Sequence, residues 1–203
     1  MLFRSPYSGT HGKNTVYQGG LEVPLIVRSP VIPIIAEGTR SNALVSLVDV
    51  YATILDIAQA PAPSGPTDSI SFLPCLTGQA AMTRTHVYAE TFQPNFIPDA
   101  ATGGPPAGYV CLRHDQALRD ARFKLIRKWR RDHSGGAPIL FEEFYDLVEG
   151  GPPDTSTMPP TPRPDWFETN DLLDSGVALD VAAQVALAQL RAMLDLEYPT
   201  LLQ

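Results

Sequence analysis

The sequence predicts an α/β chain that combines a buried strand, a long helix, a small antiparallel four-stranded sheet and a C-terminal helix. Three observations support this prediction. Residues 21–27 form an apolar, β-branched run that is typical of a buried strand. Four short β-like runs follow one helical pattern, an order typical of α+β organisation. An amphipathic helical pattern then precedes a proline near the C-terminus.

The composition is that of a folded domain. The 203 residues are 44% hydrophobic and 18% charged, which is enough apolar content for a core and excludes disorder of the whole chain. Fifteen basic and twenty-two acidic residues give a net charge of −7, so we expect no nucleic-acid partner and no attraction to anionic lipid. The longest apolar stretch, residues 23–36, is interrupted by Arg28 and three prolines. It therefore predicts no membrane span.

Two segments show the apolar spacing of a helix. Residues 41–60 carry apolar side chains at steps of three and four, which predicts a helix that Pro61 stops. Residues 179–194 show the same spacing, and Pro199 ends this second helix. The four predicted strands of the antiparallel sheet are residues 86–92, 109–113, 122–129 and 141–148. Residues 150–164, with six prolines, predict an extended loop.

Several polar features have structural rather than catalytic interpretations. Cys75 and Cys111 lack metal-site spacing, which leaves one disulfide or, as we favour, two inert buried thiols. We interpret the basic residues of 119–131 as the solvated face of a strand and its turn rather than a polyanion site. Glu142 and Glu143 are neighbours, so a strand would direct them to opposite faces, which argues against paired-carboxylate catalysis.

The glycine-punctuated segment of residues 9–20 is the main candidate for a functional site. It carries His11 and Lys13 directly before the predicted strand, and α/β proteins place ligand-binding loops at strand ends. Glycines let backbone amides approach an anion, and a lysine ammonium is a compact charge suited to a sulfate or phosphate oxygen. The same pattern is also typical of an ordinary turn.

Five segments in collinear order resemble motifs of the sulfatase family. The segment HGKNTVYQGGLEVPLIVRSP is similar to the loop-plus-strand motif of that family. The segments SNALVSLVDVYATILDIA, DSISFLPCLTG, ARFKLIRKW and EEFYDL resemble its later helix, loop and strand motifs. Gln18, Glu22 and Ala52 stand where many members have Glu, Arg and Pro. The first two departures change the charge near the site entrance and so bear on substrate preference.

The resemblance implies an alkaline-phosphatase-like sandwich. In it, residues 1–80 end the sulfatase catalytic α/β domain and residues 81–203 form a C-terminal subdomain. Lys13 falls at the sulfate-coordinating lysine of the family, a catalytic and substrate-binding role, and a solvated loop lysine is the other interpretation. His11 is a second candidate for substrate binding, although the family has no fixed ligand there and a surface or loop-packing histidine fits better.

The resemblance also implies groups that this sequence does not contain. Sulfatases use a formylglycine nucleophile, made within Cys-x-Pro-x-Arg or Ser-x-Pro-x-Arg, and a calcium ion held by Asp-Asp and Asp-Asn pairs; none of these motifs occurs in the sequence. We therefore expect a C-terminal fragment of a sulfatase that hydrolyses a sulfate ester and needs an N-terminal half, which supplies the calcium ligands. The alternatives are a phosphodiesterase or phosphonate-ester hydrolase of the same superfamily, and a non-catalytic module that retains the fold.

Overall fold

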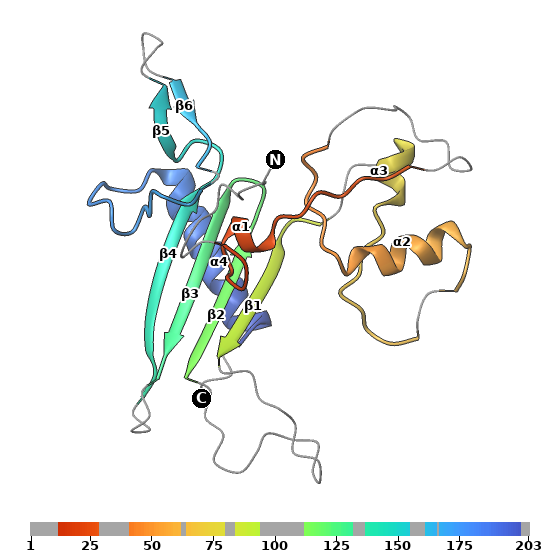
Figure 1. The fold of residues 1–203 in the computed structure, drawn as a ribbon, viewed down its shortest axis with the longest axis horizontal. Helices are drawn as coiled ribbons and strands as arrows, with labels where there is room; N and C mark the ends of the chain where they lie inside the picture. The colour runs from red at the N-terminus through yellow and green to blue at the C-terminus, as the bar shows by residue number, and fades with distance from the viewer. Residues whose placement is uncertain are drawn as a thin grey trace, which may run out of the picture. The chain divides into compact units, whose positions relative to one another are not determined.

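The computed structural model groups the chain into two units, which are described separately (Figure 1). The larger unit contains residues 1–22 and 88–203, and the smaller unit contains residues 23–87. The division into domains at residues 80 and 81 stays a prediction. The structure describes residues 12–28, 41–61, 64–79, 84–93, 112–131, 137–154, 161–165 and 167–199.

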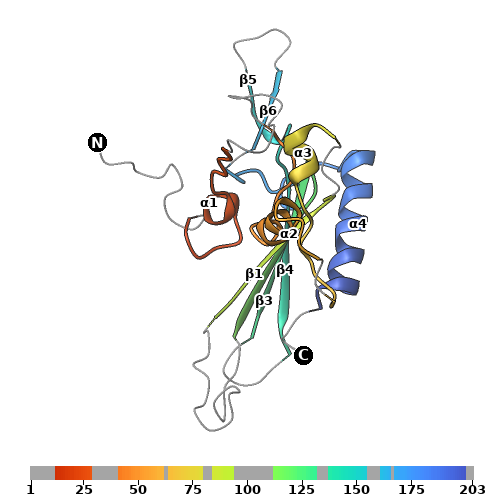
Figure 2. The same cartoon turned by 90° about the vertical axis from the view of Figure 1, so that its right-hand side faces the viewer.

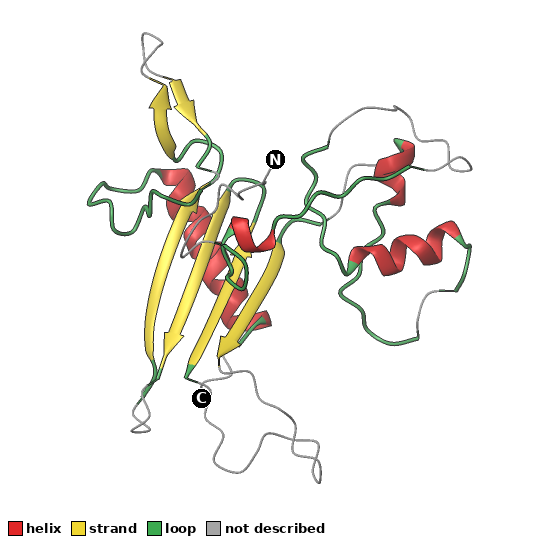
Figure 3. Cartoon of the chain, in the orientation of Figure 1, coloured by secondary structure: helices red, strands yellow, loops and turns green. Residues whose placement is uncertain are grey.

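The larger unit is built on the predicted four-stranded sheet (Figure 3). The strands lie in the order β1-β2-β3-β4 and comprise β1 Val87–Gln93, β2 Arg113–Arg119, β3 Phe123–Arg130 and β4 Ile139–Asp146. Strand β3 pairs antiparallel with both β2 and β4. The Asp120 carboxylate accepts hydrogen bonds from the backbone amides of Arg122 and Phe123 at 2.7 and 2.6 Å, which fixes the turn between β2 and β3.

The predicted strand at residues 109–113 is wrong in position. Residues 109–111 lie outside the described part of the chain, and β2 begins at Arg113. Three consecutive polar residues of β2, His114, Asp115 and Gln116, are at most 1% exposed. They satisfy their polar groups inside the protein; for example, Gln116 donates to the carbonyl oxygen of Tyr198 at 2.6 Å. This buried central strand therefore consists largely of polar residues. An apolar run in the sequence, the usual sign of a buried strand, is absent from it.

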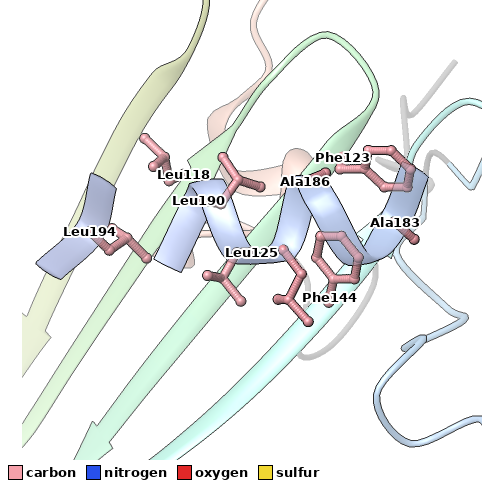
Figure 4. Close-up of a cluster of buried hydrophobic side chains, with 9 residues drawn as sticks. Leu118, Phe123, Leu125, Phe144, Ala183, Ala186, Leu190 and Leu194 are labelled. Atoms are coloured by element: carbon pink, nitrogen blue, oxygen red, sulfur yellow. The ribbon is translucent and has the colours of Figure 1, made fainter. Parts of the chain in front are cut away.

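Helix α4, Val181–Glu197, covers one face of the sheet, as the amphipathic spacing predicted (Figure 4). Asp180 caps its N-terminus by accepting from the Ala183 amide at 2.7 Å. Helix α4 and the sheet share a first core cluster of buried hydrophobic residues, which consists of Leu118, Phe123, Leu125, Phe144, Ala183, Ala186, Leu187, Leu190 and Leu194. No described helix is long and apolar enough to cross a bilayer.

Residues 12–22 cover the opposite face of the sheet (Figure 2). They include the one-turn helix α1, Gln18–Leu21, which lies on the other side of the sheet from α4. The second core cluster consists of Val16, Tyr17, Ala117, Ile126, Tyr145 and Leu147. The segment that carries Lys13 therefore packs on the four-stranded sheet.

The predicted strand at residues 21–27 is not formed. Leu21 belongs to α1, and residues 22–28 have no regular secondary structure. Val23, Leu25 and Ile26 are 71%, 52% and 88% exposed. A strand requires a hydrogen-bonded neighbour, and no described segment pairs with these residues. The apolar run is therefore present without the sheet that would bury it.

The smaller unit contains α2, Asp49–Ile57, and α3, Leu73–Thr77. Helix α2 begins at Asp49, well inside the predicted range of 41–60. The Asp49 carboxylate fixes this start by forming hydrogen bonds with backbone amides on either side of the helix in the sequence. It accepts from the backbone amides of Ser46 and Ile70 at 2.8 and 2.9 Å and pairs with Arg84. Burial alone would raise the pKa of Asp49, but these bonds outweigh it and hold the pKa below its usual value.

Two further findings concern the predicted loop and the cysteines. A two-stranded hairpin of β5, Gly151–Asp154, and β6, Thr161–Arg163, occupies part of the region predicted to be an extended loop. Cys75 in α3 is a free, half-buried thiol. Cys111 lies outside the described residues.

Candidate functional site

Lys13 lies in a tight turn directly before α1. The Thr15 hydroxyl donates to the carbonyl oxygen of Gly12 at 2.6 Å, and Asn14 adopts a left-handed φ of 67°. A Cβ atom on Gly20 would lie 2.5 Å from the Thr15 carbonyl oxygen and 2.7 Å from that of Gly12. Only glycine allows this close approach between backbone segments. The shape of the turn is therefore set by its own backbone contacts.

Lys13 is the lysine of this chain whose ammonium is exposed. The sequence contains three lysines. Lys124 and Lys128 form ion pairs with Glu168 and Glu143, whereas Lys13 makes no hydrogen bond or ion pair with the residues that the structure describes. His11, the second sequence-predicted site residue, lies outside the described residues. Its role in substrate binding stays a prediction.

Tyr17 provides the first polar anchor of the turn. Its ring is buried in the second core cluster, and its hydroxyl donates to Glu143 Oε2 at 2.6 Å and accepts from the Lys128 ammonium. Burial, together with the Glu143 carboxylate, raises the pKa of Tyr17 well above its ordinary value, so the hydroxyl stays protonated. Burial alone would raise the pKa of Glu143, but hydrogen bonds from Lys128 and Tyr17 lower it overall.

Gln18 provides the second polar anchor. Its backbone amide donates to Glu168 Oε2 at 2.5 Å, and its side-chain Oε1 accepts from Lys124 Nζ at 3.3 Å. Lys124 Nζ and Glu168 Oε1 are 2.5 Å apart, and their side chains are 1% and 0% exposed. Burial lowers the pKa of Lys124 to about 8, although the neighbouring Glu168 carboxylate opposes this shift.

A turn around Asp165 places Glu168. The buried Asp165 carboxylate accepts from the backbone amides of Thr169 and Asn170 at 3.0 Å, and Glu168 itself has a left-handed φ of 52°. A non-glycine residue in this conformation needs surrounding contacts to hold it. The turn supplies them and directs the Glu168 side chain toward Gln18 and Lys124.

The interpretation of the basic residues as a solvated strand face is wrong. Lys124 and Lys128 lie on the face covered by residues 12–22, whereas Arg127 pairs with Glu142 on the α4 face. Lys124 and Arg127 are 1% and 7% exposed. Glu142 and Glu143 point to opposite faces, as predicted. Each of these cations is thus neutralised by a carboxylate of the same unit.

The described residues do not form a calcium site. No group of three or more histidine, cysteine, aspartate or glutamate side chains is arranged among them to hold a metal ion. The carboxylates of Glu143 and Glu168, which hold Tyr17 and Gln18, are taken up by lysines and by backbone or hydroxyl donors. We derive no chemical step through calcium from these residues.

Sequence reasoning missed the partners of the turn. In the sequence, Gln18 stands out as a departure from a motif, and Lys124 belongs to a basic run and to the segment ARFKLIRKW. Glu168 follows Gln18 by 150 residues, and nothing local in the sequence links the two. A buried lysine requires a buried acid, but only the fold shows which acid it is.

Comparisons with known proteins relate the chain to sulfatases. A family model described as N-sulphoglucosamine sulphohydrolase, C-terminal, matches residues 8–149. An ulvan-active sulfatase from Formosa agariphila is 31% identical over 159 residues, covering 68% of this chain and 29% of that protein. An N-acetylglucosamine-6-sulfatase from Bos taurus is 38% identical over 79 residues, covering 38% of this chain and 14% of that protein.

The matches cover only a part of each related protein, since the chain spans less than a third of the length of either curated relative. The solved structure of a putative sulfatase from Bacteroides thetaiotaomicron is 22% identical and aligns over 72% of this chain and 23% of that chain. Its TM-score is 0.38.

Proposed function

Because the chain belongs to the sulfatase family described as N-sulphoglucosamine sulphohydrolase, C-terminal, we propose that it is the C-terminal part of a sulfatase and supplies Lys13 to bind the sulfate ester. The observation that best supports this role is the contrast among the three lysines. Lys124 forms a buried ion pair and Lys128 a half-buried one, whereas Lys13 is exposed on a turn held by its own backbone contacts.

An ammonium at this position would act by electrostatics. Its charge would attract the sulfonyl oxygens and stabilise the negative charge that develops on the leaving oxygen. An exposed ion pair in water contributes only about 0–1 kcal/mol, so the effect depends on a fixed position and on exclusion of water. The backbone contacts of Gly20 and the anchors at Tyr17 and Gln18 supply the fixed position.

The remaining walls of the site would come from polypeptide outside the described residues. That polypeptide would also hold the formylglycine nucleophile and the calcium ion that polarises the ester. Support comes from the smaller unit, where Val23, Leu25 and Ile26 and, on α2, Tyr51 and Ile54 are more than half exposed. Such apolar surface requires cover, and we infer that the N-terminal half of the enzyme provides it.

The substrate class that we infer is a sulfated sugar. The family description and the name of the bovine relative both refer to glucosamine derivatives. Lys13 would bind the sulfate group, so other residues would have to recognise the sugar. Glu22, which is exposed and stands where many members have Arg, alters charge near the turn and would influence that choice.

The test is kinetic and uses the open reading frame extended upstream of Met1. Lys13→Ala should lower kcat/KM for 4-nitrophenyl sulfate by about 100-fold to 1,000-fold, the usual loss on removing one oxyanion-stabilising group. Arg28→Ala is the matched control, since Arg28 is also an exposed cation, and should change kcat/KM by less than about twofold.

Three outcomes would overturn parts of the proposal. Full activity in Lys13→Ala would remove the lysine from the site. Turnover of bis(4-nitrophenyl) phosphate in preference to the sulfate would favour a phosphodiesterase. A folded protein that hydrolyses neither ester would favour a non-catalytic module.

A further inference from the structure

A buried ion pair lies between the sheet and the segment that carries Lys13. Lys124 projects from β3, and Glu168 comes from the turn that precedes α4 in the sequence. Their side chains are almost fully excluded from solvent, with Nζ and Oε1 2.5 Å apart. Charged pairs in such surroundings lose their hydration, and this cost offsets much of their mutual attraction.

Both partners direct a further hydrogen bond to one residue. Glu168 accepts from the Gln18 backbone amide at 2.5 Å, and Lys124 donates to the Gln18 side chain at 3.3 Å. Gln18 is the first residue of α1, and a backbone amide there has no partner within its own helix. The pair thus satisfies the start of α1 and fixes both the backbone and the side chain of the residue that follows the Lys13 turn.

The energetics favour positioning over stabilisation. Burial lowers the pKa of Lys124 to about 8 even with a carboxylate in contact, so the cost of burying the charge exceeds the attraction of its partner. Buried ion pairs of this kind are often replaceable by apolar residues without loss of stability. The other groups that bear on Lys124 are Arg119, a like charge, and Glu143, an opposite charge.

We propose that Lys124 and Glu168 are positioning residues for Lys13. Their ion pair holds Gln18 against the sheet and thereby sets the place of the preceding turn. The inference rests on the proposed function, because it assigns the pair to the orientation of a sulfate-binding lysine. Neither residue is catalytic, because their side chains are at most 1% exposed and cannot touch a substrate.

Amide hydrogen exchange on the 203-residue chain tests the structural part of this proposal, that the ion pair holds Gln18 against the sheet. The variant Lys124→Met/Glu168→Leu replaces the pair by apolar side chains and leaves no unpaired buried charge. The Gln18 amide should exchange about tenfold faster or more, as expected on loss of a hydrogen bond to a charged group, whereas β3 amides should change less than about threefold. Arg127→Met/Asp195→Leu is the control on the α4 face. It removes the ion pairs of Arg127 with Asp195 and Glu142, leaves Glu142 paired with Arg191, and should leave exchange at Gln18 unchanged.

Two exchange results would overturn the proposal. Unchanged exchange at Gln18 would mean that the pair only fills space. An equal increase at Gln18 and throughout β3 would mean that it supports the whole sheet. If Lys124→Met/Glu168→Leu does not fold, Lys124→Met/Glu168→Gln leaves no buried charge and keeps a neutral acceptor for the Gln18 amide. It should still accelerate exchange at Gln18 more than in β3, because a neutral acceptor forms a weaker hydrogen bond than a carboxylate.

A kinetic cycle on the extended reading frame tests the functional half. Replacing the pair should lower kcat/KM for 4-nitrophenyl sulfate in the wild-type background and have no further effect in Lys13→Ala, since the pair acts through Lys13. Equal losses in both backgrounds would contradict positioning. The proposed function fails separately, if Lys13→Ala is fully active while the exchange result stands.

Discussion

Raising the pH should stabilise the larger unit through Lys124. Burial lowers the pKa of this lysine from 10.5 to about 8 in the folded protein. Between these values the unfolded chain binds more protons than the folded chain, so the free energy of unfolding rises with pH. The full difference corresponds to about 3 kcal/mol, and about 2 kcal/mol of it should develop between about pH 7.5 and 10.

The assay is urea unfolding of the wild type and of Lys124→Met/Glu168→Leu over this pH range, followed by tryptophan fluorescence. Both tryptophans belong to the larger unit. Burial raises the pKa values of Tyr17 and Tyr145 in the folded protein, so these two residues lose protons only in the unfolded chain. This contribution is common to both proteins and largely cancels in the difference. The stability of the wild type relative to the variant should increase with pH. A flat or falling difference would refute the reasoning, because it would mean that the carboxylate outweighs burial.

Three further predictions concern packing and charge. Gly20→Ala should cost about 1–3 kcal/mol because the added methyl meets two carbonyl oxygens; an unchanged melting temperature would contradict this. Leu190→Ala, in the core, should cost about 2–5 kcal/mol in urea unfolding, whereas the exposed Leu196→Ala should cost less than about 0.5 kcal/mol. Asp49→Asn should destabilise the smaller unit by about 3 kcal/mol by leaving Arg84 unpaired. Since the pKa of Asp49 is lowered in the folded state, wild-type stability should also fall as the pH drops below about 4, and calorimetry would show it.

Apolar periodicity correctly predicted elements that are buried against other described parts of this chain. Helix α4 shows the spacing because one of its faces packs on the sheet. Strand β2 escaped detection because polar residues with internal partners fill it. The apolar run at residues 21–27 gave the opposite error, a predicted strand that is not formed. Apolar residues indicate burial but do not supply the neighbouring strand that a sheet needs.

The candidate site was predictable only as far as its local contacts extend. The glycines and Lys13 indicated a turn, and the close approach at Gly20 confirms a tight one. The anchors could not be predicted, because Tyr17 and Gln18 meet partners 106 to 150 residues away. Local patterns report which side chains need partners, whereas the identity of the partners depends on the completed fold.

Acylation of the Lys13 amine in the extended protein, followed by mass spectrometry, tests the central claim most directly. Lys124, which is buried, and Lys128, which is half-buried, are both ion-paired and serve as internal references. The account predicts that Lys13 is acylated rapidly in the free enzyme and that sulfate slows this reaction, whereas chloride at equal ionic strength does not. Equal acylation of Lys13 in sulfate and in chloride would contradict the account.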